Sequence, residues 1–319
     1  MSAYRKFAGF GLSLALGLIA PTIGHAQDND SQDIIHTQSN PWVSQNEPQA
    51  QMARIGRFVD ESGHLPSPAR QGITGHREMK VFIWLPHGFQ MSAALPIIVL
   101  SGKYGTPPAS YQNVAGHLAS HGFVVIAPDH EDADNGVLSD QTNQKRIDDL
   151  HDTIRSIPAI AQNAGFMPGG NLACIGFAEG ITDCLMNGGI HSEVAGLHPW
   201  GGMFSSILAI GPTAKNIPPG IETIGSPIMI AGSMADMSIK DGILAQHPES
   251  APKSRVLVAI HDFADPYVTI NRPDQPETYF WRSIVALWMK GTIGGEPSVL
   301  QGIDGYANMT SNYIQTAIR

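Results

Sequence analysis

The sequence predicts an α/β fold with a mostly parallel central sheet and helices on both of its faces. Three segments, residues 80–85, 95–100 and 123–127, are apolar at nearly every position. Such runs are typical of strands buried on both faces, because strands with one face in water alternate apolar and polar residues. Residues 108–121, between the second and third runs, carry apolar side chains at helical spacing. A strand, a helix and a strand in this order predict a parallel βαβ unit.

The alternation of strand and helix continues toward the C-terminus. One further helix is predicted from an apolar face made of Ile147, Leu150, Ile154 and Ile157. A turn at 168–170 is predicted to precede a strand at 171–175. Helices are also predicted at 181–186 and 279–289, and strands at 194–197, 227–231 and 255–260.

Composition and charge fit one large globular domain. The chain has 319 residues, of which 42% are hydrophobic and 15% are charged. This is an ordinary globular composition, with enough apolar material for a single core. The net charge is −9, and the basic residues form no cluster or stripe. Nucleic acid is therefore not a predicted partner.

The N-terminal segment has the three parts of an export signal. Arg5 and Lys6 supply positive charge, residues 9–19 are apolar, and residues 23–26 end on the small residue Ala26. We predict a signal peptide at residues 1–26 and export to the periplasm or the cell exterior; a buried helix or an anchor is the alternative. No other stretch is long and apolar enough for a membrane helix, so no span is expected after cleavage.

Residues 27–51 are rich in Gln, Asn, Ser and Asp, which predicts a disordered linker. The α/β domain is predicted to span residues 52–319. It contains the two cysteines, Cys174 and Cys184. Export implies an oxidising compartment, but the sequence leaves open whether the two form a disulfide or stay buried thiols.

The most informative segment joins a predicted strand to a predicted helix through Gly176-Phe177-Ala178-Glu179-Gly180. A turn this sharp strains its central residue, and glycine on either side lets strand and helix pack closely. The segment matches G-x-S-x-G, the turn that presents the serine nucleophile of α/β-hydrolases, at every position but the centre. A glycine-flanked turn of another α/β protein is the alternative interpretation.

Alanine at the centre removes the nucleophile. The Ala178 methyl group has no lone pair, and no base can activate it. The backbone N–H of Glu179 remains where an oxyanion donor belongs in such a turn. The start of the following helix also favours an anion.

Three further segments extend the resemblance. Residues 101–105, 118–122 and 127–130 read Ser-Gly-Lys-Tyr-Gly, Leu-Ala-Ser-His-Gly and Ala-Pro-Asp-His. They resemble motifs of the dienelactone-hydrolase-like and platelet-activating-factor-acetylhydrolase-like esterases and of bacterial cutinases. The resemblance covers roughly residues 81–289 and implies the α/β-hydrolase fold.

The first of these segments departs from the family pattern. The family reads Ser-His-Gly-x-Gly-Gly, and here Gly102 and Lys103 replace the His-Gly pair. The resemblance implies that the backbone N–H of Tyr104 is the second oxyanion donor, beside that of Glu179. A backbone donor tolerates a change of side chain, so this role could survive the departure.

The resemblance also implies an acid and a base. Asp236 follows the predicted strand at 227–231 and corresponds to the acid that orients a histidine. His261 follows the strand at 255–260 and is the candidate base, although by the family's count Phe263 or Ala264 falls at that place. The order nucleophile position, acid, base matches that of α/β-hydrolases.

Two functions fit these residues. In the first, the chain is an exported protein of the carboxylic-ester hydrolase type that is inactive as written because its nucleophile position is Ala178. In the second, Ala178 replaces the serine of a genuine secreted esterase or lipase-like enzyme. Whether the chain is an enzyme thus stays open, as does a water activated by His261. Either way the predicted ligand is an ester-like small molecule or polymer.

No metal or cofactor is predicted. The sequence has no zinc-ligand spacing, Walker loop or dinucleotide fingerprint. The acidic segment at 130–134 is interpreted as a solvated loop, because a calcium loop needs more ligands at a defined spacing. The sequence predicts neither the identity of the ligand nor the oligomeric state.

Overall fold

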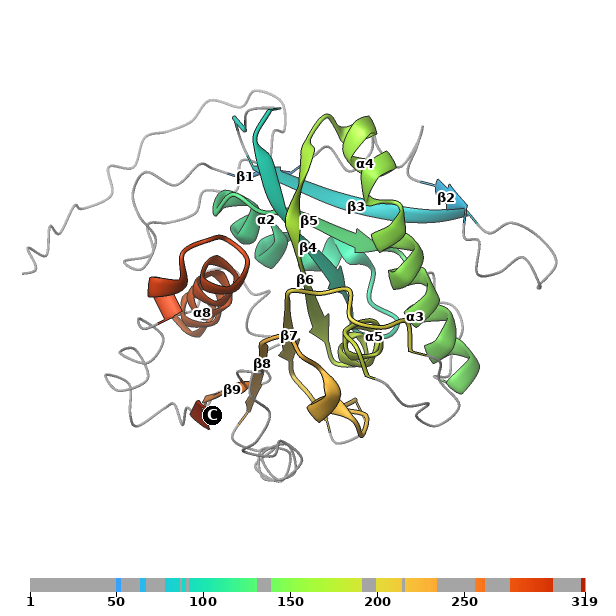
Figure 1. The fold of residues 1–319 in the computed structure, drawn as a ribbon, viewed down its shortest axis with the longest axis vertical. Helices are drawn as coiled ribbons and strands as arrows, with labels where there is room; N and C mark the ends of the chain where they lie inside the picture. The colour runs from blue at the N-terminus through green and yellow to red at the C-terminus, as the bar shows by residue number, and fades with distance from the viewer. Residues whose placement is uncertain are drawn as a thin grey trace, which may run out of the picture. The chain divides into compact units, whose positions relative to one another are not determined.

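The computed structural model describes residues 50–52, 64–66, 78–86, 88–89, 92–130, 139–190, 199–213, 216–233, 256–261, 276–300 and 317–318. A central sheet runs through this part of the chain (Figure 1). The strands are β1 (Ala50–Met52), β2 (His64–Pro66), β3 (Glu78–Pro86), β4 (Ala94–Ser101), β5 (Val124–Pro128), β6 (Met167–Phe177), β7 (Ser206–Ile210), β8 (Ile228–Ser233), β9 (Val256–His261) and β10 (Ala317–Ile318).

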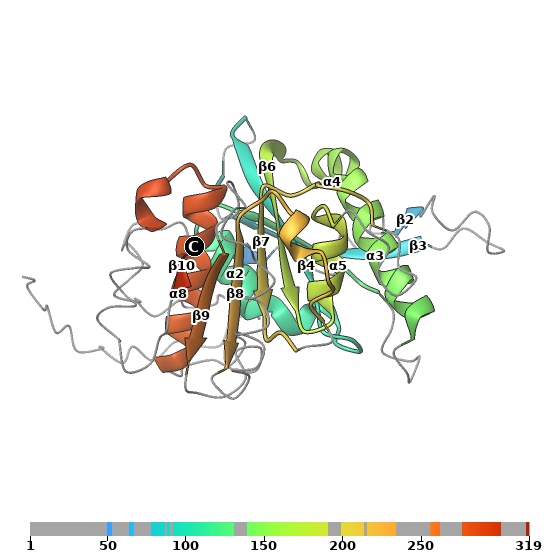
Figure 2. The same ribbon diagram turned by 60° about the horizontal axis from the view of Figure 1, so that its bottom comes forward.

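The described helices connect these strands. The α-helices are α2 (Gln112–Ser120), α3 (Asp140–Arg155), α4 (Ile157–Ala164), α5 (Gly180–Asn187) and α8 (Pro276–Thr292). Short 3-10 helices are η2 (Pro108–Tyr111), η3 (Ile221–Thr223) and η5 (Pro297–Val299). Figures 1 and 2 show α3, α4 and α5 on one face of the sheet and α2 and α8 on the other.

The sheet is parallel in its centre and antiparallel at its edges. The strand order is β1-β3-β5-β4-β6-β7-β8-β9-β10, with β2 beside β3. Every neighbouring pair from β5 to β9 is parallel. The pairs β1–β3, β2–β3, β3–β5 and β9–β10 are antiparallel. The predicted α/β architecture, a mostly parallel sheet covered on both faces, is therefore confirmed.

Alternate residues of the buried strands enter two separate cores. In β4, Ile97 and Val99 pack with α3, α4 and α5, whereas Ile98 and Leu100 pack with α2 and α8. Both sets are buried because the sheet is covered on both faces. This explains why the strands read as continuous apolar runs in the sequence.

The predicted turn at 168–170 is wrong, because these residues belong to β6. Met167 and Pro168 pair with the start of β4, and the register shifts at Leu95. Strand β7 pairs with β6 only from Ala173 onward. Among the described strands, Pro168 therefore has a neighbour on one side only, which is where a strand tolerates proline best.

Strand β7 was not predicted. The sequence favours a strand at 194–197, but those residues lie outside the described part of the chain. The strand beside β6 is Ser206–Ile210, a second short apolar run further along. Periodicity alone cannot rank two such runs.

The helix predicted from its isoleucine and leucine face is two helices. Ile147, Leu150 and Ile154 are buried in α3, but Ile157 begins α4. Pro158 stands in the first turn of α4, where its missing N–H is tolerated, and it could not continue α3.

A buried histidine makes stability depend on pH. The His117 side chain in α2 is 6% exposed. Burial lowers the pKa of His117 well below its usual value, and the nearby charges of His121 and Arg282 lower this pKa further. The folded state therefore keeps His117 neutral, whereas an unfolded chain protonates it below a pH of about 6.5.

We predict that the free energy of unfolding falls as the pH drops below about 6.5, with His117 contributing up to about 1.4 kcal/mol per pH unit. His117→Gln cannot take up this proton, so its unfolding free energy should fall less between pH 7.5 and pH 5.5. Urea denaturation of both proteins at the two pH values measures the difference. Equal pH dependence in the two proteins would contradict the assignment to His117.

Candidate active site

A sharp turn joins β6 to α5 at Ala178. This residue has φ 48°, and no other non-glycine residue in the described ranges has a positive φ. The Ala178 N–H donates to the carbonyl of Ile210 at 3.1 Å, and its carbonyl accepts from the N–H of Ile181 at 3.1 Å. Left-handed backbone is unfavourable for an alanine by about 1–2 kcal/mol, so the surrounding structure imposes it.

The two glycines of the turn are required by packing. A Cβ on Gly176 would lie 2.6 Å from the Cα of Ile181, in the helix that follows. A Cβ on Gly180 would overlap the carbonyl oxygen of Ser101 at the end of β4. Strand β6, helix α5 and the end of β4 therefore meet backbone to backbone, as the glycine spacing predicts.

The two residues assigned as oxyanion donors are in direct contact. The Tyr104 N–H donates to Oε2 of the Glu179 carboxylate at 3.1 Å. Tyr104 and Glu179 are both half-buried. The Tyr104 N–H, which the resemblance assigned to the oxyanion hole, is therefore already hydrogen-bonded to the Glu179 carboxylate.

Tyr111 explains the change in the loop after β4. A Cβ on Gly102 would lie 2.7 Å from the Tyr111 ring. The Tyr111 hydroxyl oxygen accepts the N–H of Lys103 at 2.6 Å. The ring thus occupies the space that a side chain at position 102 would need, and it fixes the backbone one residue before Tyr104.

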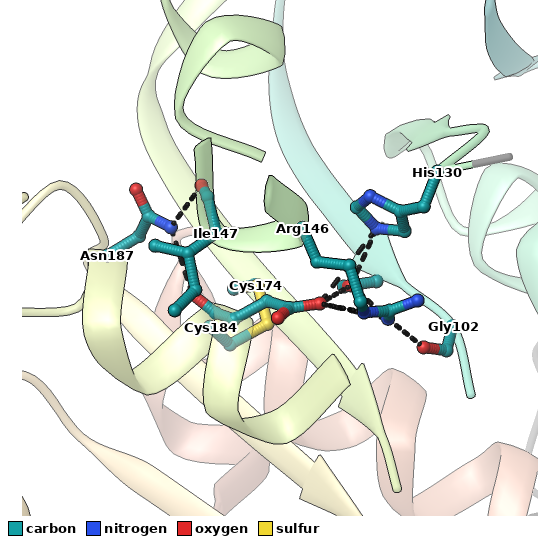
Figure 3. The surroundings of a disulfide bond; sticks show 9 residues. Gly102, His130, Arg146, Ile147, Cys174, Cys184 and Asn187 are labelled. Atoms are coloured by element: carbon teal, nitrogen blue, oxygen red, sulfur yellow. Dashed lines mark hydrogen bonds and ion pairs between the residues drawn. A yellow bond between two sulfur atoms is a disulfide. The ribbon is translucent and has the colours of Figure 1, made fainter. Parts of the chain in front are cut away.

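A buried cluster of charged and polar residues lies beside the turn, and sequence reasoning did not single it out. Its members are at most 5% exposed and come from β4, the end of β5, α3 and α5: Ser101, His130, Arg146, Asp149 and Asp183. The Arg146 guanidinium contacts Oδ2 of Asp183 at 2.9 Å and donates to the carbonyl of Gly102. Figure 3 shows Arg146 between Gly102 and His130.

Part of this cluster has the spacing of a Ser–His–Asp relay. His130 Nε2 lies 3.1 Å from Ser101 Oγ, and His130 Nδ1 lies 3.2 Å from Asp149 Oδ2. The Ser101 hydroxyl, however, donates to Asp183 at 2.6 Å. A serine nucleophile must give its proton to the histidine, and Ser101 is fully buried. This relay therefore does not present a nucleophile.

Both ring nitrogens of His130 face buried oxygen atoms. Because the Ser101 hydrogen points to Asp183, only lone pairs of Ser101 Oγ face His130 Nε2. His130 Nδ1 faces a carboxylate oxygen of Asp149. Each buried carboxylate thus has a nitrogen partner: Asp183 lies against the Arg146 guanidinium and Asp149 against the His130 ring. Buried charges persist when they are paired in this way.

A disulfide joins the two sides of the turn. Cys174 in β6 and Cys184 in α5 form the bond, with their Cα atoms 5.7 Å apart (Figure 3). Both cysteines are fully buried. The alternative that the sequence left open, free thiols, is therefore not what the structure contains. The closed loop includes Ala178 and Glu179.

The predicted acid and base lie only partly within the described residues. Asp236, Phe263 and Ala264 lie outside them. His261 is the last residue of β9 and pairs in register with Ser233 of β8. Since both strands are parallel to β6, His261 lies at the same edge of the sheet as the turn after Phe177.

No group of three or more His, Cys, Asp or Glu residues in the described ranges could hold a metal ion. None of the helices described has the length and apolar character that a bilayer crossing requires.

The glycine at the start of α5 gives a stability prediction. We expect Gly180→Ala to lower the free energy of unfolding by about 3 kcal/mol, because its Cβ would overlap the backbone of Ser101. Gly225→Ala is the matched control, since no atom lies within 4 Å of its Cβ, and it should stay within about 0.5 kcal/mol. Chemical denaturation measures both; similar losses would contradict the packing argument.

The buried arginine gives a second prediction. Arg146→Met leaves the Asp183 carboxylate buried without its cation, so we expect a loss of about 3–5 kcal/mol in the free energy of unfolding. Arg155→Met, in the same helix but exposed, should change it by no more than about 0.5 kcal/mol. A small effect of Arg146→Met would show that the cluster does not depend on this cation.

Comparison with known proteins supports the resemblance. Residues 38–157 match the family model of platelet-activating factor acetylhydrolase, isoform II. The match spans the loop after β4 and ends before the turn at Ala178. No curated protein matches the chain significantly. The covered, mostly parallel sheet is that of the α/β-hydrolase fold, and over residues 38–157 the chain is similar to the platelet-activating factor acetylhydrolases.

Proposed function

We propose that this chain is an exported protein on an esterase-type scaffold that does not hydrolyse esters, because Ala178 holds the nucleophile position. The observation that carries the proposal is the φ of 48° at Ala178, between β6 and α5. That strained turn is how α/β-hydrolases expose a nucleophile. A methyl group in this place cannot attack a carbonyl carbon.

The neighbouring donors also support a non-catalytic protein. An oxyanion hole must offer N–H groups that are free when negative charge develops on the substrate. The Tyr104 N–H instead donates to the carboxylate of Glu179. Attack on an ester would also bring a second negative charge close to that carboxylate, which opposes the reaction.

Asp236 and His261 complete the proposed site as acid and base positions. The position of His261 at the end of β9 is consistent with this role. In α/β-hydrolases the catalytic histidine comes after the nucleophile and the acid in the chain. Without a hydroxyl at residue 178, however, a base at His261 has no proton to remove. The proposed ligand is ester-like, and it would bind without being cleaved.

Export is supported by two independent features. Residues 1–26 have the charged, apolar and small-residue parts of a signal peptide. The Cys174–Cys184 disulfide is of the kind that persists in oxidising compartments, such as the periplasm and the cell exterior.

A second candidate function is a secreted esterase in which Ala178 replaces the catalytic serine. The observation that favours it is that the strained turn is kept at residue 178, with a glycine on either side as in G-x-S-x-G. The two candidates differ in one respect that can be measured. Restoring a serine rescues the enzyme but not the non-catalytic protein.

We predict that the protein and its Ala178→Ser variant both hydrolyse p-nitrophenyl acetate, butyrate and octanoate within about tenfold of the background rate, with no acyl-enzyme burst. Ala178→Gly serves as the control, since it keeps the turn without a nucleophile. An Ala178→Ser variant that gains several orders of magnitude, up to about 10⁶-fold, and shows a burst would establish the second candidate. Hydrolysis by the unaltered protein would refute both.

A further inference from the structure

The Glu179 side chain reaches across the turn and leaves its own helix uncapped. Glu179 is the N-cap residue of α5, yet its carboxylate accepts no hydrogen bond from the first turn of that helix. It accepts the Tyr104 N–H, from a residue 75 positions earlier in the chain. A carboxylate beside the start of a helix is also stabilised by the partial positive charge there.

The backbone on the Tyr104 side of this contact is held in place. The Lys103 N–H is bound by the hydroxyl of Tyr111, and the Gly102 carbonyl accepts from the buried Arg146. Gly180 packs against the backbone of Ser101, which fixes the turn relative to the loop. The Tyr104 amide is thus a preorganised donor. The half-buried Glu179 side chain is the part that can rotate away.

Tyr104 carries a second polar group that requires a partner. Its hydroxyl oxygen is buried and has no hydrogen-bond partner among the described residues. A buried hydroxyl without a partner costs about 1–3 kcal/mol, which a bound polar group could recover. This observation is independent of the Glu179 contact and lies on the same residue.

From these contacts we propose that Glu179 is a built-in occupant of a carboxylate site at the Tyr104 amide, and that the ligand which displaces it carries a free carboxylate in place of the ester group that the family resemblance implies. This proposal deepens the proposed function and rests on it, because a carboxylate is bound and not turned over, as expected of a non-catalytic binding protein. The chemical class of the ligand follows from Glu179, because the Tyr104 N–H already binds its carboxylate. A charge-assisted hydrogen bond of this kind is about twice as strong as one to a neutral carbonyl.

The tether makes Glu179 a strong competitor. A side chain on a short linker acts at an effective concentration in about the millimolar range or above. A small external carboxylate must therefore exceed that concentration, or gain contacts elsewhere, before it replaces Glu179. Removing the side chain should expose the site to even a minimal carboxylate.

The test follows the Tyr104 amide resonance in ¹⁵N-labelled full-length protein while sodium butyrate is added. In Glu179→Ala we expect this resonance to shift in a saturable manner, toward its position in the unaltered protein. The unaltered protein should need at least tenfold more butyrate, a factor that corresponds to about 1.4 kcal/mol. Methyl butyrate, which lacks the charge, should bind Glu179→Ala at least tenfold more weakly than butyrate does.

Two controls separate this contact from general charge effects. Glu296→Ala removes an exposed carboxylate far along the chain and should behave like the unaltered protein. Sodium chloride at matched concentration should leave the Tyr104 resonance unmoved. The proposal is overturned if butyrate produces no saturable shift in Glu179→Ala, if both proteins bind it equally, or if methyl butyrate binds as well. None of these readouts involves ester cleavage, so they stay separate from the hydrolysis test.

Discussion

The close approach of Gly180 to the backbone of Ser101 is the constraint on which the site depends. No side chain fits between them, so α5 starts directly against the end of β4. That contact forces the chain to turn within two residues of β6 and places Ala178 at φ 48°. It also brings Glu179 beside the loop that carries Tyr104. The strained alanine and the occupied amide are two consequences of the same packing.

Two different kinds of interaction hold this contact together one turn further along α5. The disulfide ties α5 to β6, and Arg146 ties α5 to the loop after β4 through Asp183 and Gly102. Burying five charged and polar side chains is expensive, and a well-packed apolar cluster is often as stable. What the charged cluster adds is direction, because a planar guanidinium donates its hydrogen bonds in fixed directions. It therefore fixes where the loop and the helix lie relative to each other.

The sequence predicted the fold better than it predicted the site. Strands buried on both faces leave continuous apolar runs, so β4, β5, β8 and β9 were found within a few residues. The glycines of the turn were found because their spacing reflects backbone contact. The contact between Glu179 and Tyr104 could not be predicted, because the two residues are 75 positions apart and no local sequence pattern indicates a contact at that separation.

The buried cluster escaped prediction for a related reason. Arg146 and Asp149 lie in a helix whose polar residues normally face water, and only the fold brings them to Ser101 and His130. A signal was nevertheless present, because Asp183 stands in the first turn of α5, a helix whose neighbouring residues Ile181, Cys184 and Leu185 are apolar. A lone carboxylate at such a position needs a buried partner.

The persistence of the strained turn is not by itself a sign of catalysis. Strain at an active site is usually explained by the chemistry it serves, and here residue 178 has no reactive group. Gly176 and Gly180 let β6, α5 and the end of β4 meet backbone to backbone, and this packing does not involve the side chain at 178. The turn is thus maintained by packing in the core of the fold and not by the side chain at residue 178. Function must then be argued from the groups around Ala178, and these are a carboxylate and an amide that already bind each other.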